Sequence, residues 1–159
     1  MDKKLIILLI AIILISTIGY FSFTGFFVRQ DIQQDYTKET SVVARVIDGD
    51  TVELIDGERV RLIGIDTAEK GHECYKESTD RLRELVEGKD VILERDVENK
   101  DRYDRLLRFI FLGKENINVK LVREGLAKMY TIKPNVKYHE DIQQAFLAAR
   151  TESGCLWSS

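Results

Sequence analysis

Residues 51–65 read Thr-Val-Glu-Leu-Ile-Asp-Gly-Glu-Arg-Val-Arg-Leu-Ile-Gly-Ile, and this stretch decides the fold. Apolar and polar residues alternate on both sides of Asp56-Gly57, which is the period of a strand with one buried face. An Asp-Gly pair between two alternating runs is a strong signal for a tight hairpin turn. The stretch therefore predicts two antiparallel strands, residues 51–55 and 59–65.

Strand composition continues on both sides of this hairpin. Residues 41–47 are rich in β-branched side chains, and residues 106–112 form another apolar run. Residues 89–97 place Val91 and Leu93 on one face of a strand and Ile92 on the other. Together with the hairpin, these segments predict five short strands.

Helical spacing of apolar residues appears between and after the strands. It covers residues 73–87 and 119–124, each followed by a glycine that suits a helix end, and Pro134-Asn135 opens a last helix running to about residue 152. Five strands with inserted helices fit an α+β, mainly β, domain. We expect a five-stranded Greek-key barrel of the OB-fold type with about three helices.

The N-terminal residues form a separate segment, because residues 5–28 carry no charge and are almost entirely apolar. A helix needs roughly 20 apolar residues to span a bilayer, and Lys3 and Lys4 would keep the N-terminus in the cytoplasm. We expect either a single-pass membrane anchor with the domain outside, or a cleaved signal peptide and a secreted domain. The predicted segments are an N-terminal transmembrane or signal helix (1–29), a polar linker (30–39) and the globular domain (40–159).

Charge and cysteine content restrict the function. The net charge is −3, from 24 Lys+Arg against 27 Asp+Glu, which argues against a protein that coats nucleic acid through a basic surface. Nucleic-acid binding would have to be local and metal-assisted. Cys74 and Cys155 are too far apart in sequence for a metal motif. Outside the cytoplasm they can form one disulfide, worth roughly 4 kcal/mol in the chain-entropy model, and two free thiols are the alternative.

Two acidic motifs follow apolar runs and could meet in the fold. Asp48 and Asp50 are two residues apart around Gly49, and Asp66 and Glu69 follow the apolar residues 62–65. Carboxylates of this kind can gather a hard divalent cation. Each motif also has a purely local interpretation. The first could be a plain turn, and the second could be a helix N-cap at Asp66 with Glu69 as its capping-box partner.

Two arginines complete the pattern. Arg61 lies in the predicted strand 59–65, where its simplest interpretation is a solvated face, and Arg105 ends a charged loop that reads as exposed. Arginine can bind phosphate in a bidentate manner, so carboxylates and arginines together suit cleavage of a phosphodiester. The two histidines, His72 and His139, lie in polar surroundings, and no arrangement indicates a serine hydrolase or a zinc enzyme.

Taken in order, these residues resemble the staphylococcal nuclease (thermonuclease) family over nearly the whole globular part. The resemblance rests on Ile-Asp-Gly-Asp-Thr-Val at 47–52, Arg-Leu-Ile-Gly-Ile-Asp-Thr-Ala-Glu at 61–69, Asp-Arg-Tyr-Asp-Arg-Leu at 101–106, Leu-Val-Arg-Glu-Gly-Leu-Ala at 121–127, and Leu156-Trp157. It implies a Ca²⁺-dependent nuclease that cleaves DNA and RNA with low sequence specificity and leaves 3′-phosphates. We predict no protein partner.

The resemblance also implies a metal site. Asp50, Asp66 and the backbone carbonyl of Thr67 would ligate Ca²⁺. Asp48 would act nearby through water.

Catalytic and substrate-binding roles follow from the same resemblance. Glu69 would be the general base or would orient the attacking water, and Arg61 and Arg105 would clamp the scissile phosphate. Tyr103 and Tyr130 would contact the nucleotide.

The chain departs from the family pattern at three places. Ala68 replaces a proline, Asp104 replaces the glycine before Arg105, and residues 129–134 are one residue shorter, which affects the match of Tyr130. Asp104 tolerates a positive φ better than most residues, and its charge could pair with Arg105 in the absence of substrate. The alternative function is a catalytically weak or inactive binding module with the same fold.

Overall fold

A computed structural model describes residues 37–151 and 154–157 of the chain. The predicted anchor or signal segment, and most of the predicted linker, lie outside the described residues. Among the helices of the described part, none is long and apolar enough to cross a membrane.

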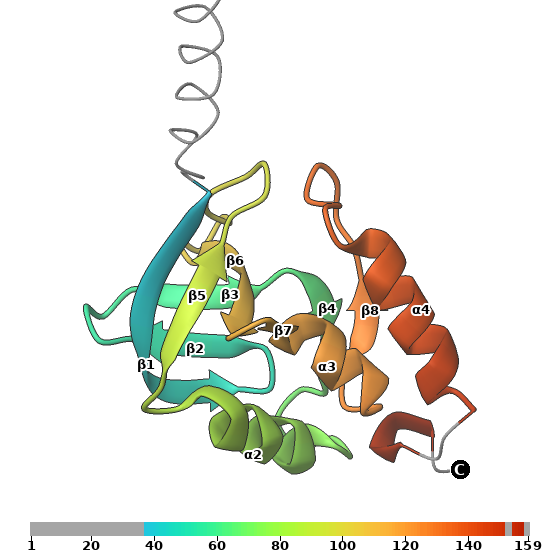
Figure 1. Ribbon diagram of the computed structural model, residues 1–159. Coiled ribbons are helices and arrows are strands. Elements are labelled where there is room, and N and C mark those ends of the chain that lie inside the picture. Colours follow the sequence, from blue (N-terminus) through green and yellow to red (C-terminus); the bar gives the residue numbers. More distant parts are fainter. Residues whose placement is uncertain (1–36, 152–153, 158–159) are drawn as a thin grey trace, which may run out of the picture. The chain divides into compact units, whose positions relative to one another are not determined.

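Five strands form a closed barrel (Figure 1). They pair in the order β3-β2-β1-β5-β6, and a parallel pairing of β3 with β6 closes the sheet. This confirms the predicted five-stranded barrel. The strands are β1 Lys38–Asp48, β2 Thr51–Leu54, β3 Arg59–Leu62, β5 Asp90–Glu94 and β6 Leu106–Leu112. The first of them begins before residue 40, so two residues of the predicted linker belong to the barrel.

The β2–β3 hairpin forms as its alternation predicts. Gly57 has φ +87° and donates its N–H to Leu54 O at 3.0 Å. The apolar residues of the two strands point into the barrel, where Val52 and Val60 are fully buried. Burial of one face explains why the polar residues of the same strands remain at the surface or in the site.

The predicted strand 59–65 is not continuous. Strand β3 ends at Leu62, and Gly64–Asp66 form β4, which pairs outside the barrel with β8, Lys128–Tyr130. Gly64 makes the break, because its φ of +80° turns the chain and a Cβ there would lie 2.5 Å from Ile142 Cδ1. The turn places Asp66 at the end of β4, where its carboxylate contacts Arg61 of β3.

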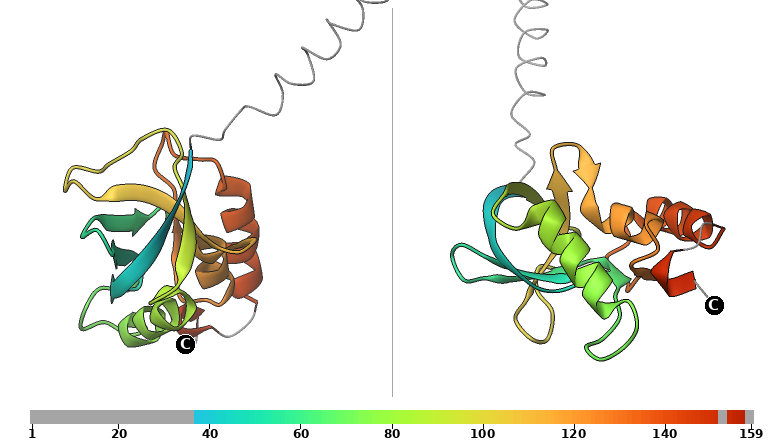
Figure 2. Two further views of the ribbon diagram at one scale, coloured as in Figure 1. Left: turned by 60° about the vertical axis from the view of Figure 1, so that its left-hand side comes forward. Right: turned by 90° about the horizontal axis from the view of Figure 1, so that it is seen from below.

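Three helices and a short 3-10 turn cover the barrel. Helices α3 and α4 lie together on one side, and α2 packs against β1 at the barrel end (Figures 1 and 2). A two-residue strand β7, Glu115–Asn116, precedes α3. The helical elements are α2 Tyr75–Val86, α3 Ile117–Arg123, α4 His139–Ala149 and η1 Cys155–Trp157.

The predicted start of the last helix and the predicted end of strand 89–97 were also wrong. The last helix begins at His139 instead of next to Pro134, because Asn135 is buried and its Oδ1 accepts the N–H groups of Val97 and Glu98 at 3.1 and 2.9 Å. The same loop contact replaces strand pairing there, so β5 ends at Glu94 and not at residue 97.

The predicted disulfide is present. Cys74 and Cys155, separated by 81 residues, are bonded with a Cα–Cα distance of 5.7 Å. The bond joins the residue before α2 to the C-terminal turn η1. It ties the start of α2 to the C-terminal end of the described chain.

Gly64 provides a stability test with a matched control. We expect Gly64→Ala to lower the free energy of unfolding by about 3 kcal/mol. The cost of a left-handed backbone conformation and the cost of overpacking against Ile142 both contribute to this loss. Gly57→Ala meets nothing within 4 Å of its new Cβ and should lose only about 1 kcal/mol. Denaturant unfolding of both variants measures the difference, and equal losses would contradict the packing argument.

Candidate functional site

A buried carboxylate lies at the centre of the site. Asp50, in the turn between β1 and β2, accepts a hydrogen bond from Thr51 Oγ1 at 3.0 Å. Its other oxygen accepts Thr67 N at 3.1 Å and Thr67 Oγ1 at 3.2 Å. The turn is tight, since a Cβ on Gly49 would lie 2.6 Å from Ser78 Oγ. Asp50 therefore joins the β1–β2 turn to the segment that follows β4.

Arg61 bridges the two acidic motifs. Its Nη2 lies 3.0 Å from Asp50 Oδ2 and 3.0 Å from Asp66 Oδ1. Its Nη1 donates to the carbonyls of Leu62 at 2.7 Å and Ile65 at 3.0 Å. The side chain is only 14% exposed, so the interpretation of Arg61 as a solvated strand face was wrong. These bonds fix the guanidinium in one orientation.

The pKa of Asp50 reflects this environment. Burial raises the pKa to about 6, and the charge of Asp48 raises it as well. The charge of Arg61 and the hydrogen bonds from Thr67 and Thr51 act in the opposite direction. The folded chain therefore holds this carboxylate at an energetic disadvantage, which an added cation would relieve.

The oxygen atoms around Asp50 suit a hard cation. Asp48 lies beside it, with Asp48 Oδ1 accepting Asp50 N at 3.1 Å, and Asp66 is half exposed. Carboxylates and a Thr67 carbonyl are the ligand types of Ca²⁺. In the part of the chain that the structure describes, no three acidic, histidine or cysteine side chains form a ready metal cluster. The positive charge between Asp50 and Asp66 is that of the Arg61 guanidinium.

Glu69 lies in an exposed loop after β4. The capping-box interpretation of Asp66 and Glu69 was wrong, because Asp66 ends a strand and α2 begins only at Tyr75. Glu69 lines a cavity of about 460 Å³ together with Asp66, Thr67 and Leu156. The fold therefore brings Glu69 to the same edge as the acidic residues.

Arg105 is held by a partner that sequence reasoning did not single out. Its Nε and Nη2 both lie 2.7 Å from Asp101 Oδ2. Arg105 therefore has a fixed partner, although it ends a loop whose residues 102–104 are exposed as predicted. Asp101 Oδ1 accepts the N–H groups of Tyr103 and Arg105 at 2.9 and 3.1 Å. Although burial acts to raise the pKa of Asp101, the hydrogen bonds and charge of Arg105 lower it. The only sequence signal was the Asp101-to-Arg105 spacing.

Asp104 has the expected positive φ but not the expected pairing with Arg105. It adopts φ +64°, as expected for a residue in a glycine position. Its carboxylate pairs with Lys100 at 3.1 Å, not with Arg105. The extra charge is therefore directed away from the arginine.

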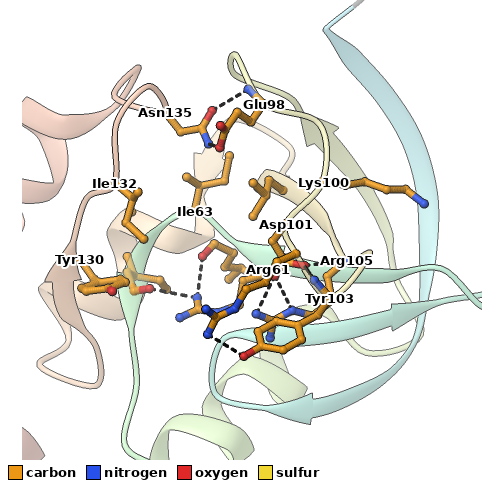
Figure 3. Close-up of a pocket in the computed structure, with 15 residues that line it drawn as sticks. Arg61, Ile63, Glu98, Lys100, Asp101, Tyr103, Arg105, Tyr130, Ile132 and Asn135 are labelled. Carbon is orange, nitrogen blue, oxygen red and sulfur yellow. Dashed lines mark hydrogen bonds and ion pairs between the residues drawn. The ribbon is translucent and has the colours of Figure 1, made fainter.

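Both arginines line one cavity of about 540 Å³ (Figure 3). Tyr103 and Tyr130, which are 64% and 53% exposed, line the same cavity. Arg102 and Arg105 lie over the Tyr103 ring at 4.7 and 5.4 Å from its centre. Sequence reasoning missed three further lining residues, which come from distant segments: Ile132, Glu98 and Asn135.

Known proteins are similar in sequence to this chain. A family model described as "Staphylococcal nuclease homologue" matches residues 59–159. A thermonuclease of Staphylococcus hyicus is 36% identical over 164 residues, which cover 97% of this chain and 96% of that protein. The chain belongs to the staphylococcal nuclease family. A thermonuclease of Staphylococcus intermedius is 41% identical over 133 residues, 77% of this chain and 79% of that protein.

More distant similarity extends to an endonuclease of Bacillus subtilis, YncB, which is 32% identical over 125 residues, 72% of this chain and 59% of that protein. These relatives identify the chain as a nuclease of the staphylococcal nuclease family. Asp48, Asp50, Arg61 and Asp66 are joined by direct contacts. Arg105 lines one cavity with Arg61, and Glu69 lines another with Asp66.

Asp101 gives a test of how this nuclease orients Arg105. Asp101→Asn keeps the side-chain shape but removes the charged acceptor of the guanidinium, so we expect kcat/KM to fall about tenfold from misplacement alone. Asp104→Asn is the control, because its pair with Lys100 is exposed and Asn also tolerates positive φ. Steady-state cleavage of a labelled oligonucleotide measures both. Equal effects would show that Asp101 does not orient Arg105.

Proposed function

We propose that the protein is a Ca²⁺-dependent nuclease that hydrolyses DNA and RNA with low sequence specificity and leaves 3′-phosphate ends. The observation that carries the proposal is the Asp50–Arg61–Asp66 cluster. Arg105 lines a cavity with Arg61, and Glu69 lines a cavity with Asp66. Family membership supports hydrolysis of phosphodiesters.

The proposed metal ligands are Asp50, Asp66 and the carbonyl of Thr67, with Asp48 acting through water. When bound, Ca²⁺ would polarise the phosphoryl group and offset the charge that develops on its oxygens. The raised pKa of Asp50 supports this assignment, because burial leaves its carboxylate in need of a cation.

Arg61 and Arg105 would bind the non-bridging oxygens of the scissile phosphate. Each guanidinium is already oriented by carboxylates of the chain, so little side-chain entropy is lost when phosphate binds. Glu69 would take a proton from the attacking water or hold that water in line with the leaving 5′-oxygen. Its exposed loop position leaves it accessible to water.

Tyr103 and Tyr130 support contact with an unpaired nucleotide. Both are exposed aromatic rings beside the arginines in one cavity, and a base can stack on such a ring whatever its identity. Arginine contacts to phosphate carry no sequence information. Low specificity for DNA and RNA substrates follows from both features, and no protein partner is required.

We also infer that the domain acts outside the cytoplasm, either attached to the cell membrane by residues 1–29 or secreted after cleavage. The supporting observation is the Cys74–Cys155 disulfide, because such bonds persist in oxidising compartments. Intact-mass measurement of the protein from its native host separates the two cases. We expect the full chain mass for an anchor, and a loss of the N-terminal residues for a signal peptide.

Calcium dependence and the role of Glu69 are tested together on the full-length chain. We expect cleavage of single-stranded DNA and of RNA with Ca²⁺ and none with EGTA. Glu69→Gln should lower kcat by about 100-fold or more while Ca²⁺ binding by calorimetry is retained, since Glu69 is not a proposed ligand. Cleavage unaffected by EGTA would rule out the calcium proposal. A folded, inactive parent would favour a binding module instead.

A further inference from the structure

The loop that carries Glu69 has few interactions of its own. Within the described residues, no side chain of residues 68–73 makes a hydrogen bond or ion pair, and the backbone bonds are local. His72 N donates to Glu69 O at 3.0 Å, and Tyr75 N donates to His72 O at 3.4 Å. Because these few local bonds do not attach the loop to the rest of the domain, its conformation depends on the contacts at its two ends.

The upstream end of the loop is fixed to the barrel. Thr67 donates through its N–H and its hydroxyl to Asp50, and Asp66 pairs with Lys128 in the β4–β8 ladder. This anchor is formed by residues that belong to the proposed metal site. It does not restrain the chain beyond Thr67.

The downstream end is fixed by the disulfide. Cys74 directly precedes α2, is buried, has φ +67° and is bonded to Cys155. Six residues, 68–73, lie between this anchor and Thr67. Glu69 is thus held between a barrel contact and a covalent bond.

The partner cysteine belongs to a segment that is itself well fixed. Leu156 N donates to Gly125 O at 3.2 Å, and the Trp157 ring packs edge-on against Phe146 with ring centres 5.3 Å apart. These contacts attach η1 to the end of α3 and to α4, and η1 lies beside the start of α2 (Figure 1). Leu156 also lines the cavity that Glu69 lines. The disulfide therefore connects the Glu69 loop to the helical layer.

We propose that the Cys74–Cys155 disulfide positions the loop carrying Glu69, so that its reduction slows turnover while the metal and phosphate groups stay in place. This inference rests on the proposed function, in which Glu69 acts on the attacking water. A dithiol reductant supplies two electrons and two protons, which yield two cysteine thiols and the oxidised form of the reductant. The nuclease would then reach full activity only in an oxidising compartment.

The remaining site groups should be insensitive to this reduction. Asp50, Arg61 and Asp66 lie on or beside barrel strands, and Arg105 is held by Asp101. None of these contacts involves the loop between Thr67 and Cys74. Loss of the disulfide should therefore affect kcat far more than KM or Ca²⁺ binding.

The test compares the parent with the double variant Cys74→Ser/Cys155→Ser, each with and without Glu69→Gln, below the unfolding transition of all four proteins. We expect the double variant to lose about tenfold in kcat, with KM and calorimetric Ca²⁺ affinity changed less than about twofold. In the Glu69→Gln background the same change should have no further effect on kcat, because groups that act as a unit are not additive. Amide exchange of residues 68–73 should become faster.

Arg81→Gln is the matched control. Arg81 also joins α2 to the end of α3, through bonds to Glu124 at 2.7 and 2.8 Å, but it lies away from the Glu69 loop in sequence. It should lower stability and leave kcat unchanged. Dithiothreitol should reduce the kcat of the parent to that of the double variant and leave the double variant unaffected.

Two results would overturn the proposal. One is a folded double variant with parental kcat, and the other is an equal loss of kcat with and without Glu69. If the parent itself shows no Ca²⁺-dependent cleavage, the proposed function fails separately. Amide exchange then tests the positioning role by itself. Unchanged exchange of residues 68–73 between the parent and the double variant would exclude that role.

Discussion

The buried Asp50 carboxylate is the interaction on which the site depends. It accepts hydrogen bonds from Thr51 and Thr67 and pairs with Arg61, so one side chain joins the β1–β2 turn, β3 and the segment after β4. A buried charge is costly without such partners, which is why its pKa is raised to about 6 even with them. The same cost makes this point of the fold suitable for a cation.

The two arginines show how an acidic protein could present groups for the proposed phosphate binding. The chain carries a net charge of −3, and each guanidinium is paired with carboxylates of the chain itself, Arg61 with Asp50 and Asp66 and Arg105 with Asp101. The two guanidinium groups are thus oriented at one cavity. Binding of this kind is local, as expected for an enzyme that acts on one phosphodiester at a time.

Prediction from sequence succeeded where it rested on a local signal, either the alternation of apolar and polar residues or a turn motif. The β2–β3 hairpin formed around Asp56-Gly57, and strand β6 formed with the expected residues. It failed where a distant contact overrode local preference. Gly64 turns β4 out of the barrel against Ile142, and Asn135 bonds the 97–98 backbone instead of starting a helix.

The sequence by itself determined the barrel and the family, because alternation, the Asp-Gly turn and the ordered motifs are all properties of neighbouring residues. Only the tertiary structure decided how the functional side chains are held. Arg61 is buried between two carboxylates, Arg105 is bonded to Asp101, and the Glu69 loop ends at a disulfide. Those contacts join residues from different strands and loops, so their geometry is fixed by packing and closure of the chain and not by local propensity.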